Sequence, residues 1–314
     1  MEGFNVKLAF LYAGQGAQHV GMGRDLYEAY PAFRQVLDSA PVDFDLKKLC
    51  FDGPEDQLND TRYTQPCMVA FAAGVTALLR EAGITPDYAA GLSLGEYSAL
   101  QCAGVFDAKT AISLVAFRGQ AMADAVQGRP CGMAAVLGMD RDALKAVCTE
   151  ASDAGVVECT NFNCPGQIVI SGDAAAVDKA GELAKAAGAK RVLPLKVSGP
   201  FHTSLMAPAG DALREKFQSV DFGAMEIPVL FNCLGDLKGE ADTIPNLLEQ
   251  QVQSSVYLED TIRRLGELGV DTVVEIGPGR TLSGFVKKTV KGIKCYPVET
   301  AEELQAAIAA LRGE

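Results

Sequence analysis

The sequence has no long hydrophobic run and few positive charges, and both deficits narrow the classes of protein it can belong to. Its longest apolar stretch, Cys67 to Leu79, covers 13 residues, whereas a membrane span needs about 18 or more. We therefore expect a buried helix there and no membrane partner. The net charge of -12 argues against a nucleic-acid partner, because phosphate recognition needs a concentrated basic surface.

The cysteine patterns of metal sites and disulfide frameworks are also missing. Nine cysteines are scattered without a C-x-x-C pair or a metal-like spacing to histidine. Reduced thiols are the simpler interpretation, and no metal site is expected. The opening residues, Met1 to Asn5, lack the basic region of a signal peptide. These features together predict a cytoplasmic location.

The chain alternates strand-like and helix-like segments, which predicts an α/β fold with a mostly parallel sheet. A helix is expected from about Thr64 to Arg80, with Pro66 in its first turn. Thr300 and Glu303 have the spacing of a capping box at the start of a last helix. The expected strands are Val6 to Tyr12, Tyr88 to Leu92, Pro228 to Phe231 and Thr272 to Ile276.

A separate unit is predicted between Gly132 and Leu195. Its expected helices are Arg141 to Ala151 and Ala174 to Ala187, and its expected strands are Met133 to Leu137, Val156 to Asn161, Gln167 to Ser171 and Lys190 to Leu195. This βαββαβ order is the ferredoxin-like pattern. We therefore expect a ferredoxin-like subdomain at residues 129–198, inserted into a catalytic domain made of residues 1–128 and 199–314. The junctions are placed near Gly128-Arg129-Pro130 and Ser198-Gly199-Pro200.

The strongest chemical motif is Gly91-Leu92-Ser93-Leu94-Gly95, between an expected strand and an expected helix. G-x-S-x-G in that place is the nucleophile elbow, a tight turn that exposes the serine hydroxyl. The N–H of Leu94 at the helix N-terminus can then point at a developing oxyanion. An ordinary glycine-rich turn is the alternative.

A serine nucleophile needs a base, and the chain has only two histidines, His19 and His202. His202 follows Phe201 in a loop that enters a helix after the inserted unit, whereas His19 lies in the first glycine-rich loop. The order of serine before histidine agrees with α/β-hydrolase-type sites, and this favours His202. No third acid is indicated, because a backbone carbonyl can orient the imidazole equally well.

Two further segments have both a functional and a structural interpretation. The loop from Gly14 to Gln18 does not match a Walker loop or G-x-G-x-x-G. Its glycine turn can instead bring the N–H of Gln15 beside Ser93 as a second oxyanion donor, or it can be a plain turn. Arg118, at the polar end of an apolar segment, is either a bidentate clamp on a free carboxylate or a snorkelling or capping residue.

Together these motifs resemble the malonyl-CoA:acyl carrier protein transacylase family over essentially the whole chain. The resemblance is carried by Gly14-Gln15-Gly16-Ala17-Gln18, Thr64-Gln65-Pro66, Gly91-Leu92-Ser93-Leu94-Gly95-Glu96, Arg118-Gly119, Pro165-Gly166-Gln167, Phe201-His202 with Ser204 and Met206, and Gly277-Pro278-Gly279. It implies an α/β-hydrolase-like core with a ferredoxin-like subdomain. It also implies transfer of a malonyl group from malonyl-CoA to acyl carrier protein in fatty acid synthesis, with no cofactor.

The family's site residues carry over position by position. The resemblance implies that Ser93 is the nucleophile, His202 the base and Arg118 the malonyl carboxylate clamp, with the N–H groups of Gln15 and Leu94 as the oxyanion hole. It places Gln251 where a backbone carbonyl holds the histidine, Asn232 near a site-lining position, and Phe201 where bulk resists a methyl branch on the acyl group. One departure is Leu92, where the family usually has a histidine in polar contact with the acyl group.

Three rival functions share part of this pattern. A serine hydrolase or thioesterase shares the elbow and the histidine, but Arg118 and the absence of an HGGG-type oxyanion motif count against it. An acyltransferase of polyketide assembly differs only in its carrier. A non-catalytic binding module is disfavoured because Ser93 and His202 occur together.

Overall fold

A four-stranded parallel sheet carries the first of two units into which the chain divides. The structure is a computed structural model that describes residues 6–196 and 199–313. The first unit consists of Met1–Gly119, Asp221–Phe231 and Ile262–Glu314. Its sheet has the order β10-β9-β1-β2, built from β1 (Leu8–Tyr12), β2 (Tyr88–Gly91), β9 (Thr272–Ile276) and β10 (Lys294–Val298). Every strand pair is parallel, which confirms the expected α/β fold.

The register of this sheet brings three loops to one edge. Tyr12, the last residue of β1, pairs with Gly91 of β2 and with Ile276 of β9. These strands therefore end level with one another, at the carboxyl edge where open α/β sheets bind ligands. The loops that leave this edge carry Gln15 and Ser93, and the third contains the Gly277-Pro278-Gly279 turn.

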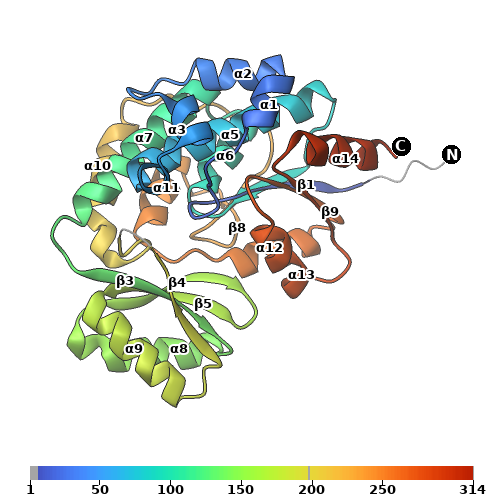
Figure 1. Ribbon diagram of the computed structural model, residues 1–314. Coiled ribbons are helices and arrows are strands. Elements are labelled where there is room, and N and C mark those ends of the chain that lie inside the picture. The colour runs from blue at the N-terminus through green and yellow to red at the C-terminus, as the bar shows by residue number, and fades with distance from the viewer. Residues whose placement is uncertain (1–5, 197–198, 314) are drawn as a thin grey trace. The chain divides into compact units, whose positions relative to one another are not determined.

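Helices surround the strands of the first unit (Figure 1). They are α1 (Arg24–Ala29), α2 (Pro31–Asp38), α3 (Leu46–Asp52), α4 (Glu55–Leu58), α5 (Thr61–Glu81), α6 (Gly95–Cys102), α13 (Thr281–Thr289) and α14 (Ala301–Arg312). The short β7 (Leu230–Phe231) also belongs to this unit, while α7 (Ala108–Ala125) and α12 (Leu258–Glu267) include residues of both units. Because α5 is apolar on nearly all sides, it is buried along most of its length.

The second unit, Gln120–Val220 with Asn232–Thr261, contains an antiparallel sheet of order β4-β5-β3-β6. Its elements are β3 (Cys131–Leu137), α8 (Arg141–Ala151), η1 (Ser152–Ala154), β4 (Val157–Cys164), β5 (Gln167–Asp173), α9 (Ala174–Ala186) and β6 (Arg191–Pro194), followed by η2 (Ser204–Met206), α10 (Ala207–Phe217), β8 (Asp236–Leu237) and α11 (Ile244–Val252). The stretch from β3 to β6 has the predicted βαββαβ order, and its strand order is that of the ferredoxin-like fold.

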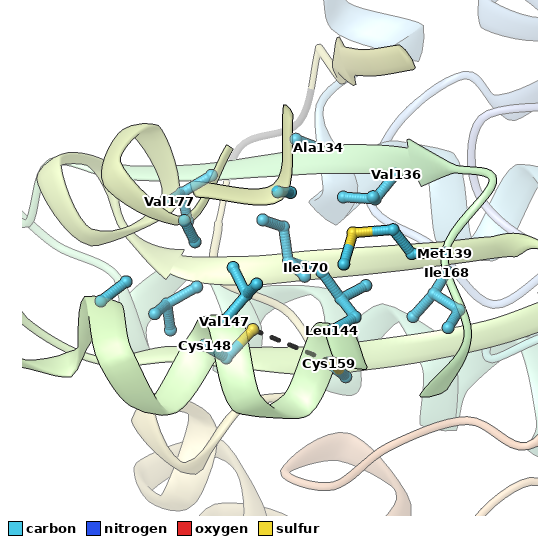
Figure 2. Close-up of a cluster of buried hydrophobic side chains, with 14 of the residues drawn as sticks. Ala134, Val136, Met139, Leu144, Val147, Cys148, Cys159, Ile168, Ile170 and Val177 are labelled. Atoms are coloured by element: carbon cyan, nitrogen blue, oxygen red, sulfur yellow. Dashed lines mark hydrogen bonds between the residues drawn. The ribbon is translucent and has the colours of Figure 1, made fainter. Parts of the chain in front are cut away.

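Helices α8 and α9 cover one face of this antiparallel sheet (Figure 1). Aliphatic side chains of the strands, such as Val136 and Ile170, pack there against Leu144 of α8 and Val177 of α9 (Figure 2). Cys148 and Cys159 belong to the same cluster, with 3.9 Å between their sulfur atoms. The subdomain therefore has a hydrophobic core of its own.

Several predicted elements have other ends in the structure: β3 begins at Cys131, β4 ends at Cys164 and β7 covers only Leu230–Phe231. Helix α5 begins at Thr61 rather than near Thr64, because the Asp60 side chain accepts a hydrogen bond from the N–H of Arg62 and caps it there. Pro66 therefore lies inside the helix rather than in its first turn.

The capping box at α14 is also only half formed. Thr300 Oγ1 accepts from the N–H of Glu303 at 3.2 Å, as predicted. The Glu303 carboxylate, however, accepts from the N–H of Glu299 rather than from that of Thr300, at 2.9 Å. The Glu303 side chain therefore bonds to Glu299, the residue before the N-cap Thr300.

The sequence also led to expectations about membrane spans, metal sites and disulfides. Within residues 6–196 and 199–313, no helix is long and apolar enough to cross a membrane. The same residues contain no group of three or more His, Cys, Asp or Glu side chains that could hold a metal ion. All nine cysteines are free thiols. Ser198 of the expected junction and the opening residues Met1 to Asn5 lie outside the described residues.

Candidate active site

Ser93 occupies a sharp turn between β2 and α6, with φ +53° in the left-handed region. A non-glycine residue pays about 1–3 kcal/mol for that backbone. The two glycines of the motif make the turn possible. A Cβ on Gly91 would lie 2.0 Å from the carbonyl carbon of Gly95, and one on Gly95 would lie 2.2 Å from the Tyr12 carbonyl oxygen. Close backbone contact therefore requires glycine on both sides of Ser93, as in a nucleophile elbow.

The loop after β1 lies directly against this elbow. A Cβ on Gly14 would lie 2.5 Å from the carbonyl oxygen of Leu92, the residue before Ser93. Gln15 follows in the same loop, and its side-chain Oε1 accepts a 2.7 Å hydrogen bond from the Thr61 hydroxyl. Leu94 begins α6 as its N-cap residue, so its N–H lies at the positive end of the helix dipole.

Arg118 is buried in α7 with only 1% of its surface exposed. Its Nη1 donates to Gln65 Oε1 at 2.9 Å and its Nη2 to Ser93 Oγ at 3.2 Å. It also lies over the Tyr97 ring, 5.3 Å from the centroid. An arginine so placed neither snorkels to solvent nor caps a helix end. A cation is thus held at the serine hydroxyl.

Burial lowers the pKa of the Arg118 guanidinium, while the neighbouring Tyr97 and Glu96 act in the opposite direction. Arginine starts from a pKa so high that it stays protonated at neutral pH. The same burial raises the pKa of Tyr97, so its phenol is neutral. The first unit therefore presents a desolvated positive charge beside Ser93, an arrangement suited to a carboxylate ligand.

His202, in the second unit, is buried with φ +61°. Its Nδ1 lies 2.8 Å from the backbone carbonyl oxygen of Gln251, a buried residue of α11. A carbonyl can only accept, so Nδ1 carries the proton and the neutral imidazole has its lone pair on Nε2. That tautomer is the one a general base needs.

The loop that carries His202 is held by its own side chains and by β4. Thr203 Oγ1 donates to the Pro200 carbonyl at 2.6 Å, and the Ser204 N–H donates to Glu158 Oε2 at 3.0 Å. Phe201 packs beside Gly199, where a Cβ would lie 2.6 Å from its ring. These contacts fix the backbone on both sides of His202.

This chain is similar in sequence and structure to proteins of one known family. The family model "Acyl transferase domain" matches residues 9–309. Malonyl CoA-acyl carrier protein transacylase of Bacillus subtilis is 44% identical over 311 residues, covering 98% of both chains. The solved transacylase structure from Clostridium perfringens superposes with a TM-score of 0.94 at 38% identity, covering 98% of both chains. The chain belongs to the malonyl-CoA:acyl carrier protein transacylase family of acyl transferases.

A third relative in this transacylase family shows a partner. A structure described as a type II PKS acyl-carrier protein in complex with its malonyl-transacylase matches with a TM-score of 0.93 at 39% identity, covering 98% of this chain and 100% of the other. All of these matches span nearly the full length of both proteins, so the shared architecture includes both units.

The residues predicted from the sequence to have site roles belong to two units, each described separately. Gln15, Ser93, Leu94 and Arg118 belong to the first unit, and Phe201, His202, Asn232 and Gln251 belong to the second. Asn232 is fully buried, and its carbonyl accepts from the N–H of Tyr257 at 2.9 Å.

The second histidine, His19, has a different environment. It is exposed and bonded to the Glu299 carboxylate and to the carbonyl of Val20. Partial burial lowers the pKa of His19, but these hydrogen bonds outweigh it and raise the pKa above its ordinary value. Glu299 Oε2 also accepts from the N–H of Gly279, at 2.8 Å. His19 thus joins two loops through the Glu299 carboxylate, and its raised pKa favours the protonated form, which disfavours a role as a neutral base.

Two polar residues, Thr61 and Gln65, bond to the predicted site residues but had no role assigned from the sequence, although Gln65 belongs to the Thr64-Gln65-Pro66 motif. Both are buried polar side chains on α5, which is otherwise largely apolar. The Gln65 Nε2 donates to Thr61 Oγ1 at 3.0 Å. Their spacing of four residues was the available signal, since such residues share one face of a helix. A pair of polar residues on a buried face indicates a partner elsewhere in the fold.

Proposed function

We propose that this protein transfers the malonyl group of malonyl-CoA to the phosphopantetheine thiol of acyl carrier protein through a malonyl ester on Ser93. The observation that carries the proposal is the buried Arg118 guanidinium, whose Nη2 lies 3.2 Å from the Ser93 hydroxyl oxygen. A hydrolase of simple esters has no need of a buried cation at its nucleophile. A transferase of a diacid thioester needs one to bind the free carboxylate.

In the first half-reaction, His202 Nε2 removes the Ser93 proton as Oγ attacks the thioester carbonyl of malonyl-CoA. The Gln251 carbonyl, 2.8 Å from Nδ1, stabilises the imidazolium that forms. The N–H groups of Gln15 and Leu94 stabilise the oxyanion of the tetrahedral intermediate. The C–S bond then breaks, and the imidazolium returns its proton to the sulfur of CoA.

In the second half-reaction, the carrier's phosphopantetheine thiol takes the place of CoA. His202 removes the thiol proton, the sulfur attacks the malonyl ester, and the carbon–oxygen bond to Ser93 breaks as Oγ regains its proton. The result is a ping-pong cycle that uses no cofactor, because malonyl-CoA is itself the donor. Reduced, free cysteines fit a cytoplasmic setting in fatty acid synthesis.

Two other side chains shape the acyl pocket in this proposal. Phe201 precedes the base and is largely buried, so its bulk disfavours a methyl branch on the acyl group. Asn232 is buried in the same unit and serves as a lining residue. Leu92, where the family usually has histidine, offers no polar contact, which leaves Arg118 as the main recognition element for the carboxylate.

The test is intact-protein and peptide mass spectrometry after mixing with malonyl-CoA. One malonyl mass is expected on the peptide that contains Ser93 and none on Ser93→Ala. His202→Ala should slow labelling by about 10²–10⁴-fold or more, while His19→Ala should have a far smaller effect. Labelling of a cysteine, or a larger loss with His19→Ala, would contradict the mechanism.

A polyketide acyl carrier protein is a second candidate for the acceptor of the malonyl group. One structural relative is described as a type II PKS acyl-carrier protein in complex with its malonyl-transacylase. Transfer assays with a fatty acid carrier and a polyketide carrier in parallel would separate the two functions by their kcat/KM. The same assay measures release of free malonate. Rapid hydrolysis without a carrier would favour a thioesterase instead.

A further inference from the structure

A continuous chain of hydrogen bonds joins the loop after β1 to the nucleophile through the interior of the first unit. Thr61 Oγ1 donates to Gln15 Oε1 at 2.7 Å and accepts from Gln65 Nε2 at 3.0 Å. Gln65 Oε1 then accepts from Arg118 Nη1 at 2.9 Å, and Arg118 Nη2 donates to Ser93 Oγ. Thr61, Gln65 and Arg118 are each at most 1% exposed.

The direction of every bond in this chain follows from Arg118. A guanidinium has donors only, so Gln65 must present its oxygen to Arg118 and its nitrogen to Thr61. The Thr61 hydroxyl has one hydrogen. Since its oxygen accepts from Gln65, that hydrogen is directed to Gln15, which must present Oε1. The side chain at position 61 must therefore accept a hydrogen bond from the Gln65 amide and donate one to the Gln15 amide, and a hydroxyl group does both.

The backbone holds Thr61 firmly in place beside α7. Thr61 is the first residue of α5, directly after the capping residue Asp60. A Cβ on Gly119, the residue after Arg118, would lie only 2.7 Å from the Thr61 carbonyl oxygen. The first turn of α5 and the Arg118 segment of α7 are therefore in close backbone contact, which fixes the position of the Thr61 backbone.

We infer that Thr61 is a positioning residue that sets acyl selectivity. Through the Gln65 amide it holds the Arg118 guanidinium in the orientation that receives a carboxylate. Through the Gln15 side chain it connects the same guanidinium to the loop proposed to supply an oxyanion N–H. This inference rests on the proposed malonyl transfer. Thr61 acts only through Gln65 and Gln15, and Gln65 and Arg118 stand between it and Ser93 in the hydrogen-bond chain.

The Thr61→Val variant keeps the shape of the side chain and removes the hydroxyl. The Gln65 nitrogen then loses this acceptor and the amide can rotate, which turns a donor toward Arg118. We expect malonyl transfer to lose roughly 10- to 100-fold in kcat/KM, the range for a buried hydrogen bond. Acetyl transfer should fall less, because it does not use Arg118. The ratio of malonyl to acetyl kcat/KM is therefore the diagnostic quantity.

Thr61→Ser is the matched control, because it restores the hydroxyl and should keep the wild-type ratio. In a Gln65→Ala background, Thr61→Val should change the ratio no further, since the effect passes through Gln65. An unchanged ratio in Thr61→Val, or an equal loss in Thr61→Ser, would overturn the inference. Thr61→Ala serves if Thr61→Val does not fold, as judged by its melting temperature. Failure of the proposed function itself is distinct, because wild-type protein would then show no malonyl ester on Ser93.

Discussion

Arg118 combines two properties that are costly together, full burial and a permanent charge. A buried charge is tolerated only where partners compensate it, and Gln65 and Ser93 supply neutral acceptors. The buried Glu96 supplies a negative charge nearby. In the proposed function, a malonyl carboxylate would add a charged acceptor in direct contact with the guanidinium, and this is the proposed basis of acyl selectivity.

Replacing Arg118 with alanine should greatly reduce malonyl transfer and spare acetyl transfer. Truncating one partner of a buried, hydrogen-bonded charge pair costs about 2–5 kcal/mol, which corresponds to roughly 30- to several-thousand-fold in kcat/KM. Steady-state rates with malonyl-CoA and acetyl-CoA measure the difference. Arg118→Lys should rescue only partly, because an ammonium lacks the forked geometry. An equal reduction for both acyl groups would make Arg118 a purely structural residue.

The contact between α5 and α7 depends on Gly119, which has no room for a side chain. A Cβ there would meet the Thr61 carbonyl oxygen at 2.7 Å and the Arg62 Cα at 3.1 Å. Gly119→Ala should therefore lower the free energy of unfolding by about 1–3 kcal/mol, as overpacking does. Gly284 of α13 is the control, because a Cβ there meets nothing within 4 Å.

Gly284→Ala should instead raise the free energy of unfolding by about 0.4–1 kcal/mol, since alanine narrows the unfolded ensemble and favours the helix. Denaturant titrations of both variants provide the measurement. A shift of the same sign at both positions would show that the α5–α7 contact can relax around an added methyl group.

The ends of β5 and α9 meet at Asp173, whose carboxylate has partners on two other segments. It accepts from Arg129 Nε at 2.6 Å and from the N–H of Val156 at 2.8 Å. The hydrogen bond from Arg129, then that from Val156, lowers the pKa of Asp173 despite the opposing effect of burial. A depressed folded-state pKa contributes stability above the unfolded pKa of about 3.9, and this is lost as the pH falls through the folded value.

The Asp173→Asn variant should therefore melt at a lower temperature than wild type at pH 7, and the gap should close below about pH 4. Melting curves between pH 3 and pH 7, as rough limits, give the profile. Asp153, paired with Lys179 but 70% exposed, is the control. Asp153→Asn should have little effect at any pH, because exposed ion pairs contribute little. A gap for Asp173→Asn that persists at low pH would rule out the charged pair as its source.

The charge of the whole molecule bears on how it meets its partner. With a net charge of -12, the protein repels an acidic carrier at long range, so productive encounter needs local positive charge. Lys287 and Lys288, exposed in the last turn of α13, form one basic pair. Lys190 and Arg191, exposed at the start of β6, form another.

Charge reversal of Lys287 and Lys288 to glutamate should raise the KM for the carrier and leave malonyl labelling of Ser93 unchanged. The carrier KM of wild type should also depend on salt, because screening limits both the long-range repulsion and the local attraction to a range of about 8 Å at physiological ionic strength. Carrier titrations at two salt concentrations measure both effects. The same reversal at Lys190 and Arg191 tests the second pair, and an unchanged carrier KM for both pairs would exclude them.

Much of the fold was predictable because its signals are local. The helix Arg141–Ala151 and the strand Thr272–Ile276 have the predicted bounds, since apolar periodicity and caps lie within each segment. The strand Lys294–Val298 was not predicted, and it contains Pro297, a residue type that disfavours strands. Proline is tolerated there because β10 is at the edge of its sheet. A strand's place in a sheet depends on distant pairings and cannot be judged from the strand alone.

The residues of the candidate site also differ in how far they could be predicted from the sequence. Ser93 and its glycines could be recognised from five consecutive residues, because a tight turn has local requirements. The two interpretations of Arg118 were separated only by burial and by its bond to Gln65, 53 positions earlier in the chain. Thr61 had no assigned role until the fold placed it between Gln15 and Gln65. Local geometry is encoded in neighbouring residues, whereas the partner of a buried polar group is chosen by tertiary packing.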